Sequence, residues 1–224
     1  MRTFAISDIH GNNELFRVAL RQIDFKKEDK LFLLGDFIDR GIDSKGVLDT
    51  VIQLLENGYH LECLMGNHEK MLLDASLSTD HLHQWLLNGG YATLDSFKVN
   101  AVEEIPSRYF SLINSFKYFV EDENFVFVHA ALNMKIANPL MDMETILWER
   151  NPARYLDLDW LGNRKLIHGH TPTSQAAILK AIENDSKTIC IDNGSFVNRK
   201  NYGTLCVLHL ETLEVNFCQR SRST

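Results

Sequence analysis

The sequence predicts an α/β fold in one domain over residues 1–224, and three observations support this. The first third alternates apolar, strand-like runs with amphipathic helical segments, the second half is strand-rich, and polar clusters follow the strand-like runs. Strand, helix, strand, helix, strand is the pattern of right-handed βαβ units on a largely parallel sheet. A chain of 224 residues is long enough to bury one sizeable core.

The first third of the chain supplies the clearest elements. Short apolar runs predict three strands, at residues 2–7, 30–35 and 59–65. Apolar residues recur at helical spacing in the two segments between them, residues 12–23 and 44–58. Asn12 or Asn13 suits the cap of the first helix, and Gly58 is a stop signal for the second. These elements predict a parallel sheet.

The rest of the chain is first irregular and then strand-rich. We expect two short helices between about 70 and 120, one at 81–90 ended by Gly89 and one at 106–116 with Pro106 in its first turn. Apolar runs predict further strands at residues 117–122, 124–130, 164–169 and 187–192. Residues 203–210 and 213–219 read as a hairpin, and residues 220–224 as a loose tail. The second half should be more antiparallel than the first.

Composition excludes several classes of protein. The net charge is 23 minus 30, or −7, with a pI near 5.7, which argues against a surface for nucleic acid. No apolar stretch approaches the roughly 18 residues of a membrane span, and the polar start does not resemble a signal peptide. The four cysteines show no CxxC spacing and are expected to be reduced thiols. We therefore expect a cytoplasmic protein with no membrane or nucleic-acid partner, and its oligomeric state stays open.

Polar clusters follow every strong strand candidate. They contain Asp, Asn and His side chains and lie at residues 8–11, 35–41, 66–69, 129 and 168–170. Each cluster alone is more often a turn, a helix cap or a structural histidine. However, the carboxyl ends of strands in open α/β sheets form binding sites, and all the clusters share this position. Their joint occurrence predicts one shared site.

The residue types indicate the chemistry of that site. Asp, His and Asn ligands without Cys suit a hard or borderline divalent metal such as manganese, iron or zinc. The ligands suffice for two ions, which in such sites lie roughly 3.5–4 Å apart and clamp both oxygens of an in-line displacement. An aspartate is the natural bridge because its two oxygens can serve both ions.

The motifs resemble those of the PPP-type serine/threonine phosphatases, within the calcineurin-like metallophosphoesterases. The likeness is to small bacterial and phage (lambda-phosphatase-like) members, and its motifs are "DIHG", "GDFIDRG", "GNHE", "VHA" and "GHT". It extends to "WLLNGG", "LWER" and "IDNG", and covers residue 4 to about residue 195. The fold that this resemblance implies is a β-sandwich of two mixed sheets flanked by helices, in α/β/β/α layers.

The resemblance also implies ligands for two divalent ions, of which manganese is our expectation. Asp8 and His10 would bind the first ion, and Asp36 would bridge both. The second ion would be bound by Asn67, His129 and His170.

Four further residues would act on the substrate according to the same resemblance. His68 would be the general acid that protonates the leaving alkoxide, and Asp39 would hold its imidazole. We expect Asp39 to keep His68 protonated close to neutral pH. Arg40 and Arg150 would bind the phosphate oxygens with their guanidinium forks. Direct attack by metal-bound hydroxide would need no phosphoenzyme.

The sequence departs from the family pattern at two positions and leaves other residues open. Ala131 stands where many bacterial relatives have Gly, which could alter the turn that carries His129. Pro172 replaces the second His of the "GHTH" found in broader metallophosphoesterases, which lowers the weight of a nuclease. His168 and Asp192 lie beside the matched motifs without an assigned role.

These observations predict a metal-dependent phosphoester hydrolase. The expected substrate is phosphoserine or phosphothreonine in a protein or peptide, with phosphotyrosine as a further candidate. A diadenosine-tetraphosphate hydrolase, or another nucleotide phosphohydrolase, would use the same site. A catalytically inactive interaction scaffold ranks below both because no ligand or general acid is missing from the sequence.

Overall fold

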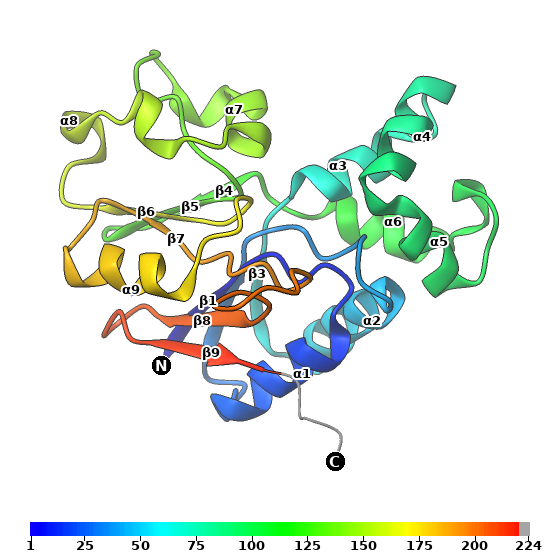
Figure 1. Ribbon diagram of the computed structural model, residues 1–224, viewed down its shortest axis with the longest axis horizontal. Helices are drawn as coiled ribbons and strands as arrows, with labels where there is room; N and C mark the ends of the chain where they lie inside the picture. The colour runs from blue at the N-terminus through cyan, green and yellow to red at the C-terminus, as the bar shows by residue number, and fades with distance from the viewer. Residues whose placement is uncertain (220–224) are drawn as a thin grey trace.

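Two mixed β-sheets lie face to face with helices outside them in the computed structural model, which describes residues 1–219 (Figure 1). The first sheet has the order β3-β2-β1-β8-β9. Its strands are β1 (Thr3–Ile6), β2 (Lys30–Leu33), β3 (His60–Cys63), β8 (Leu205–His209) and β9 (Val215–Cys218). The second sheet has the order β4-β5-β6-β7. Its strands are β4 (Phe119–Glu121), β5 (Phe125–Val128), β6 (Lys165–His168) and β7 (Thr188–Cys190). The expected sandwich of two mixed sheets is confirmed.

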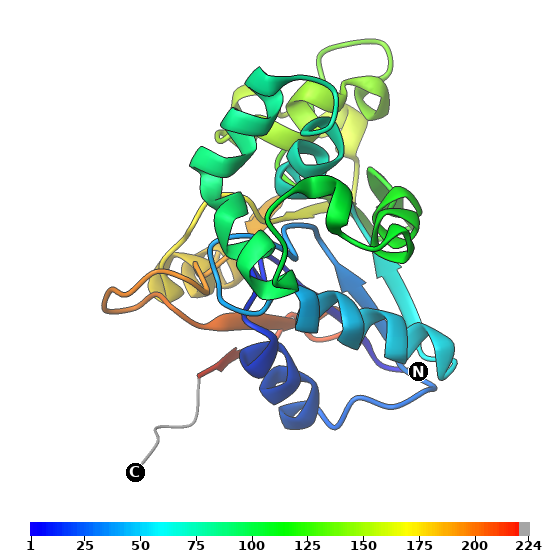
Figure 2. The same cartoon turned by 90° about the vertical axis from the view of Figure 1, so that its right-hand side faces the viewer.

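Helices occupy most of the connections. The first sheet is flanked by α1 (Asn13–Gln22) and α2 (Ser44–Glu56). A helical group on the same side of the molecule follows β3 (Figure 2): α3 (Asn67–Asp74), α4 (Thr79–Trp85), α5 (Tyr91–Phe97) and α6 (Ser107–Asn114). The second sheet is flanked by α7 (Met143–Trp148), α8 (Leu158–Leu161) and α9 (Gln175–Glu183).

The strand directions correct one expectation. β1, β2 and β3 are parallel as predicted, and β8 and β9 form the predicted antiparallel pair. The second sheet is more parallel than predicted, because β5, β6 and β7 run in one direction and only β4 is antiparallel. Helix α9 makes the parallel connection from β6 to β7, and no helix is predicted there from the sequence. Only Ile178 of this helix is buried.

Strand alternation divides the core between the two faces of each sheet. In β1, Phe4 and Ile6 join the cluster under the outer helices, whereas Ala5 joins the cluster between the sheets. Phe32 of β2 stacks on Phe127 of β5 across the sandwich, with ring centroids 4.0 Å apart and an interplanar angle of 12°. Side chains in a strand alternate between the two faces of the sheet. A shift of one residue in these strands would therefore exchange the residues that face the helices with those that face the other sheet.

The predicted end of the helix at Gly89 is confirmed, because the helical backbone stops at this residue. Residues Leu86–Gly90 form a π-helical turn, labelled η1, that leads directly into α5. Gly89 has φ of 112° and ψ of 7°, a non-helical conformation that kinks the chain between the predicted helix and α5. A Cβ atom at Gly89 would lie 3.0 Å from the backbone nitrogen of Arg40, and that nitrogen donates to the Gly89 carbonyl at 3.3 Å. The absence of a side chain at Gly89 therefore lets the loop after β2 pack closely against η1.

Three further expectations concern the cysteines, membrane spans and the end of the chain. The four cysteines are free, as expected. Within residues 1–219, no helix combines the length and apolar character needed to cross a bilayer. The predicted tail at 220–224 lies outside the described residues.

Arg2 and Asp29 join the start of β1 to the loop before β2. Arg2 donates from Nε to Asp29 Oδ1 at 3.1 Å and from Nη2 to Oδ2 at 2.6 Å, and the backbone nitrogen of Lys26 also donates to Oδ2. These bonds lower the pKa of Asp29, with the Arg2 side chain as the main cause. The carboxylate is 2% exposed, whereas Arg2 is 45% exposed.

The variant Asp29→Asn should therefore lower the free energy of unfolding at neutral pH by roughly 1 kcal/mol, after allowance for the exposed arginine. A lowered folded pKa stabilises above the ordinary value of 3.8 and loses this contribution as pH falls through the folded value. Urea unfolding of the variant and the parent should thus differ at about pH 7, and the difference should begin to shrink as the pH falls below about 4. Asp24→Asn, at an exposed carboxylate, is the control. A difference that persists at low pH would contradict the prediction.

Candidate metal centre and catalytic site

Six of the ten candidate residues share an unusual backbone conformation after the strands. Their φ angles are positive at Asp8 (52°), His10 (48°), Asp36 (55°), Asp39 (69°), Arg40 (67°) and His170 (71°). L-residues adopt this left-handed region at a cost, and such positions concentrate at functional sites. The sharp turns bring loops that follow β1, β2, β3, β5 and β6 to one place between the sheets.

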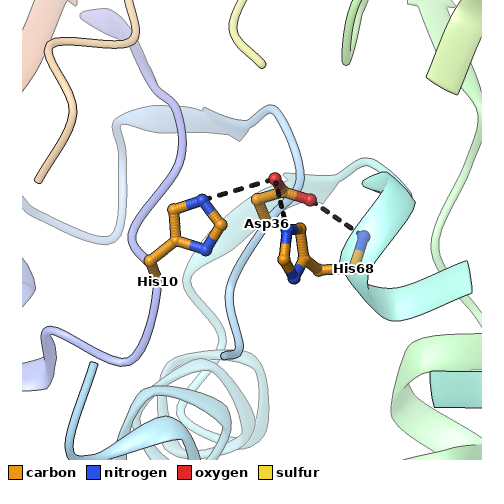
Figure 3. A group of neighbouring side chains, drawn as sticks. All are labelled: His10, Asp36 and His68. Carbon is orange, nitrogen blue, oxygen red and sulfur yellow. Dashed lines mark hydrogen bonds and ion pairs between the residues drawn. The ribbon is translucent and has the colours of Figure 1, made fainter. Parts of the chain in front are cut away.

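Asp36 lies at the centre of this place, as the prediction of a bridging carboxylate requires. Its Oδ2 lies 3.4 Å from His10 Nε2, and its Oδ1 lies 3.4 Å from His129 Nε2. Figure 3 shows His10 and His68 on two sides of the carboxylate. Each oxygen of one aspartate thus faces a different histidine.

The second group of ligands comes together as the resemblance implies. Asn67 Oδ1 lies 3.0 Å from both His129 Nε2 and His170 Nδ1. His129 Nδ1 donates to the carbonyl of Leu34 at 2.8 Å, which leaves the lone pair of Nε2 facing the group. Ligand atoms of Asp36, His129 and His170 lie within 4.8 Å of one another. This is the arrangement expected of neutral histidine ligands oriented by a carbonyl.

The first group is built in the same way. His10 Nδ1 donates to the carbonyl of Ile38 at 3.0 Å, so His10 Nε2 presents its lone pair toward Asp36. Asp8 Oδ1 lies 3.9 Å from this nitrogen. Ser7 Oγ and the backbone nitrogen of His170 donate to the Asp8 carboxylate. Ligand atoms of His10, Asp36 and His68 also lie within 4.8 Å of one another, so His68 adjoins this group.

The electrostatics of the buried groups fit divalent cations. Burial raises the pKa of Asp8, and burial together with the charge of Asp8 raises the pKa of Asp36 well above its ordinary value. Burial lowers the pKa of His10 well below its ordinary value and that of His170 to about 2, which keeps both imidazoles neutral. The two buried carboxylates repel each other when both are charged, and the neutral imidazoles have free lone pairs. Two divalent ions would neutralise the carboxylates and accept the lone pairs.

His68 and Asp39 form the pair that the resemblance implies. His68 Nδ1 lies 2.6 Å from Asp39 Oδ2, and both residues are fully buried. Asp39 also accepts hydrogen bonds from Thr93 Oγ1 at 2.7 Å and from Trp85 Nε1 at 3.0 Å. His68 Nε2 has no hydrogen-bond partner among the described residues and lies 3.9 Å from Asp36 Oδ2. This nitrogen is therefore free to meet a substrate.

The expectation that Asp39 keeps His68 protonated near neutral pH is contradicted by the direction of the pKa shifts. Burial lowers the pKa of His68 well below its ordinary value, and the nearby charge of Arg40 adds to the effect. Burial raises the pKa of Asp39 to about 7. Each partner is driven toward its neutral form, because complete burial penalises charge on both.

The two predicted phosphate-binding arginines occupy different settings. Arg40 is half-buried, and its Nη1 lies 2.8 Å from His10 Nε2. Arg150 is exposed, yet its charge lowers the pKa of both His68 and His170, which places it within electrostatic reach of the site. Arg40 thus contacts a candidate ligand directly, whereas Arg150 acts on the site through its charge.

Glu69 holds two of the site loops together. Its Oε1 accepts from the backbone nitrogens of Phe37 (2.8 Å) and Ile38 (3.2 Å). Its Oε2 accepts from those of Asp36 (2.9 Å) and Gly66 (3.0 Å). Burial raises the pKa of Glu69 to about 8, while the N–H donors favour the carboxylate. One side chain thereby fixes the backbone that carries Asp36 to the backbone that carries Asn67 and His68.

Replacing Glu69 by Gln should therefore destabilise the chain by about 1–3 kcal/mol, because an amide NH2 would face buried N–H donors and leave them unpaired. Urea unfolding measures this loss. The control is Glu14→Gln, which changes an exposed first-turn acid of α1. Equal stability of the two variants would refute the role of Glu69 as a clamp.

Close packing explains the glycines that precede Asp36 and Asn67. Gly35 has φ of 94°, and a Cβ atom there would lie 2.8 Å from His129 Nδ1. A Cβ atom at Gly66 would lie 2.2 Å from Asp36 Oδ1. Ala131, in contrast, has no positive φ and is fully buried, so the turn after His129 does not require glycine.

His168 and Asp192, which the sequence left open, differ in their relation to the site. His168 is buried outside both ligand groups and lines a pocket of about 210 Å³ that Arg150 and Cys190 also line. Asp192 is buried, and the charges of Asp8 and Asp36 help to raise its pKa, so it adjoins the site. Sequence reasoning missed the supporting side chains, namely Ser7, Trp85, Thr93, Ser195 and Phe196. Only their position beside the quoted motifs could have pointed to them.

Comparison with known proteins agrees with this geometry. Residues 1–202 match the family model described as calcineurin-like phosphoesterase. A serine/threonine-protein phosphatase 1 from Salmonella typhimurium is 40% identical over 88 residues, which cover 39% of this chain and 38% of that protein. A symmetrical bis(5'-nucleosyl)-tetraphosphatase from Chromobacterium violaceum is 29% identical over 186 residues, covering 82% of this chain and 61% of that protein. The matched segments thus span less than two thirds of either relative.

Solved structures show the same fold at low sequence identity. A cold-active protein-tyrosine phosphatase of a psychrophilic Shewanella aligns with a TM-score of 0.69 at 18% identity, over 97% of this chain and 80% of that one. The family match covers most of the chain and the two sheets have the family's arrangement, which confirms the resemblance seen in the motifs. The chain belongs to the calcineurin-like phosphoesterase family.

Proposed function

We propose that the chain is a phosphoester hydrolase that uses two divalent metal ions, with phosphorylated protein as the substrate. The observation that carries the proposal is the position of Asp36, whose two oxygens each lie 3.4 Å from a histidine nitrogen of a different ligand group. The ions would be held by Asp8, His10, Asp36, Asn67, His129 and His170. When bound, such ions supply a nucleophile at neutral pH and neutralise charge on the phosphoryl group.

Other residues of the chain would bind the phosphate and supply a proton. Arg40 and Arg150 would bind phosphate oxygens, and a guanidinium fork suits this because it offers parallel donors. His68 would hold a proton at Nε2 for the leaving oxygen, because this nitrogen is buried beside Asp36 and has no partner among the described residues. A neutral ring can carry this proton if its Nδ1 accepts from a protonated Asp39. The 2.6 Å contact with Asp39 would fix the ring in that orientation.

A dinucleoside polyphosphate is the second candidate substrate. The similarity to a protein named symmetrical bis(5'-nucleosyl)-tetraphosphatase extends over 82% of the chain, whereas the similarity to the protein named serine/threonine-protein phosphatase 1 covers 39%. Both substrates would present a phosphorus–oxygen bond to the same metal-binding residues, a phosphate ester in the peptide and a phosphoanhydride in the dinucleotide. The preference for one substrate over the other would therefore depend on residues around the metal site and not on the metal ligands.

Kinetics on matched substrates would test the proposal. The purified chain, loaded in turn with manganese, iron or zinc, would be given a phosphoserine peptide and diadenosine tetraphosphate, and kcat/KM would be compared. We expect hydrolysis of both, with a higher kcat/KM for the peptide. A higher value for the dinucleotide would transfer the proposal to the second candidate, and no hydrolysis with any metal would refute it.

A further inference from the structure

Phe196 lies directly against two residues of the proposed site. Its ring centroid is 4.4 Å from the guanidinium carbon of Arg40, within the range of a cation–π contact. It is also 4.8 Å from the ring centroid of His10, with the rings nearly perpendicular at 89°. The side chain is 37% exposed, so Phe196 lies at the edge of the site and not in the core.

The segment before Phe196 is held firmly, although it contains no regular secondary structure. Asp192 Oδ1 accepts from the backbone nitrogen of Gly194 at 2.6 Å, and Gly194 then turns with φ of 64°. Ser195 Oγ donates to the carbonyl of Asp8 at 2.7 Å, with the carbonyl of Ile9 also within 3.0 Å. These bonds attach the segment to the loop that carries Asp8 and His10, so the position of Phe196 follows from theirs.

Arg40 is held at its backbone and at its side chain. Its backbone nitrogen donates to the carbonyl of Gly89, and its guanidinium lies on the face of Phe196. The guanidinium also contacts His10 Nε2 at 2.8 Å, but this nitrogen is one of the proposed metal ligands. If an ion takes the lone pair of His10, the contact with Phe196 remains to orient the guanidinium.

We propose that Phe196 is a positioning residue that holds the Arg40 guanidinium in place to bind a phosphate oxygen. This inference rests on the proposed function, because it assumes that Arg40 binds phosphate. It gives the sequence "IDNGSF" (191–196) a role: Asp192 and Ser195 fix the loop, and Phe196 acts through Arg40. An arginine free to swing would lose more side-chain entropy on binding phosphate than one held on an aromatic face.

The test measures binding of inorganic phosphate by calorimetry to the manganese-loaded chain, together with KM and kcat for p-nitrophenyl phosphate. Phe196→Leu keeps an apolar side chain and removes the aromatic face. We expect it to weaken phosphate binding and raise KM by roughly 3- to 10-fold. The manganese content and the melting temperature should stay unchanged, and Phe196→Tyr should restore phosphate binding.

A matched control and a double variant distinguish an effect of Phe196 through Arg40 from a general loss of stability. Tyr202→Leu removes a similar aromatic contact, since Arg199 lies 5.4 Å from the Tyr202 ring, and it should leave phosphate binding unchanged. In an Arg40→Ala background, Phe196→Leu should have no further effect on phosphate binding.

Three results would overturn the inference. They are equal phosphate binding by Phe196→Leu and Tyr202→Leu, an undiminished effect of Phe196→Leu in the absence of Arg40, and no phosphate binding by the parent chain. If the parent binds phosphate but hydrolyses no phosphoester with any metal, the proposed function fails while the calorimetry still decides the inference.

Discussion

Asp36→Asn is expected to lower the metal content from about two ions per chain to one or fewer, and to slow phosphoester hydrolysis by about a thousandfold or more. Metal ions contribute several kcal/mol of transition-state stabilisation, and each 1.36 kcal/mol corresponds to about a tenfold change in rate. Asparagine has nearly the same size but offers only one oxygen. It cannot face His10 and His129 with an oxygen on each side, as Asp36 does at 3.4 Å.

Metal analysis after dialysis and steady-state kinetics would measure the two effects of Asp36→Asn. Asp185→Asn is a matched control, because Asp185 also has a positive φ of 52° but lies outside both ligand groups. A variant that kept two ions and a tenth of the parent's rate would show that Asp36 does not bridge.

His68→Asn is expected to spare both ions and to lower kcat for a phosphoserine peptide by about 10²–10⁴-fold, the usual contribution of a general acid. The loss should be much smaller for p-nitrophenyl phosphate, because nitrophenolate is a good leaving group that needs little protonation. This difference separates proton donation from metal binding. Asn67→Ala should show the opposite behaviour and weaken metal binding, because its Oδ1 faces His129 and His170 at 3.0 Å.

The partner of His68 provides a second test of the same role. Asp39→Asn should lower kcat for the peptide, and the double variant should be no slower than His68→Asn alone, because the two side chains act as a pair at 2.6 Å. His60→Asn, at an exposed position of β3, is the control. An equal loss on both substrates, or loss of metal from His68→Asn, would exclude the general-acid role.

The sequence predicted the parts of the fold and site that depend on local pattern. The first three strands, their helices and the clusters at the strand ends follow from apolar periodicity and from residue type. Family resemblance added the partition of those clusters into ligands, acid and phosphate-binding residues. The structure brings each of these residues to one place, with Arg150 at the exposed edge.

The parts that were missed depend on contacts between distant segments. Glu69 accepts four hydrogen bonds from the backbone of two loops, and its place after His68 in the sequence shows none of these partners. Trp85, the first residue of "WLLNGG", donates to Asp39, which is 46 residues away in the chain, and no local pattern shows this bond. The lowered pKa of His68 was also missed, because the sequence shows its neighbour Asp39 but not the complete burial of both.

The left-handed backbone of the candidate residues bears on how this chain could be engineered. Asp8, His10, Asp36, Asp39, Arg40 and His170 each hold a conformation that costs on the order of 1–3 kcal/mol for a residue with a side chain. Glycine at such a position relieves the strain and, at Asp8 or Asp36, also removes a buried carboxylate. A screen that selects only for heat resistance in a metal-free medium would therefore enrich inactive chains, and thermostable catalysts should be sought by changing residues outside these turns.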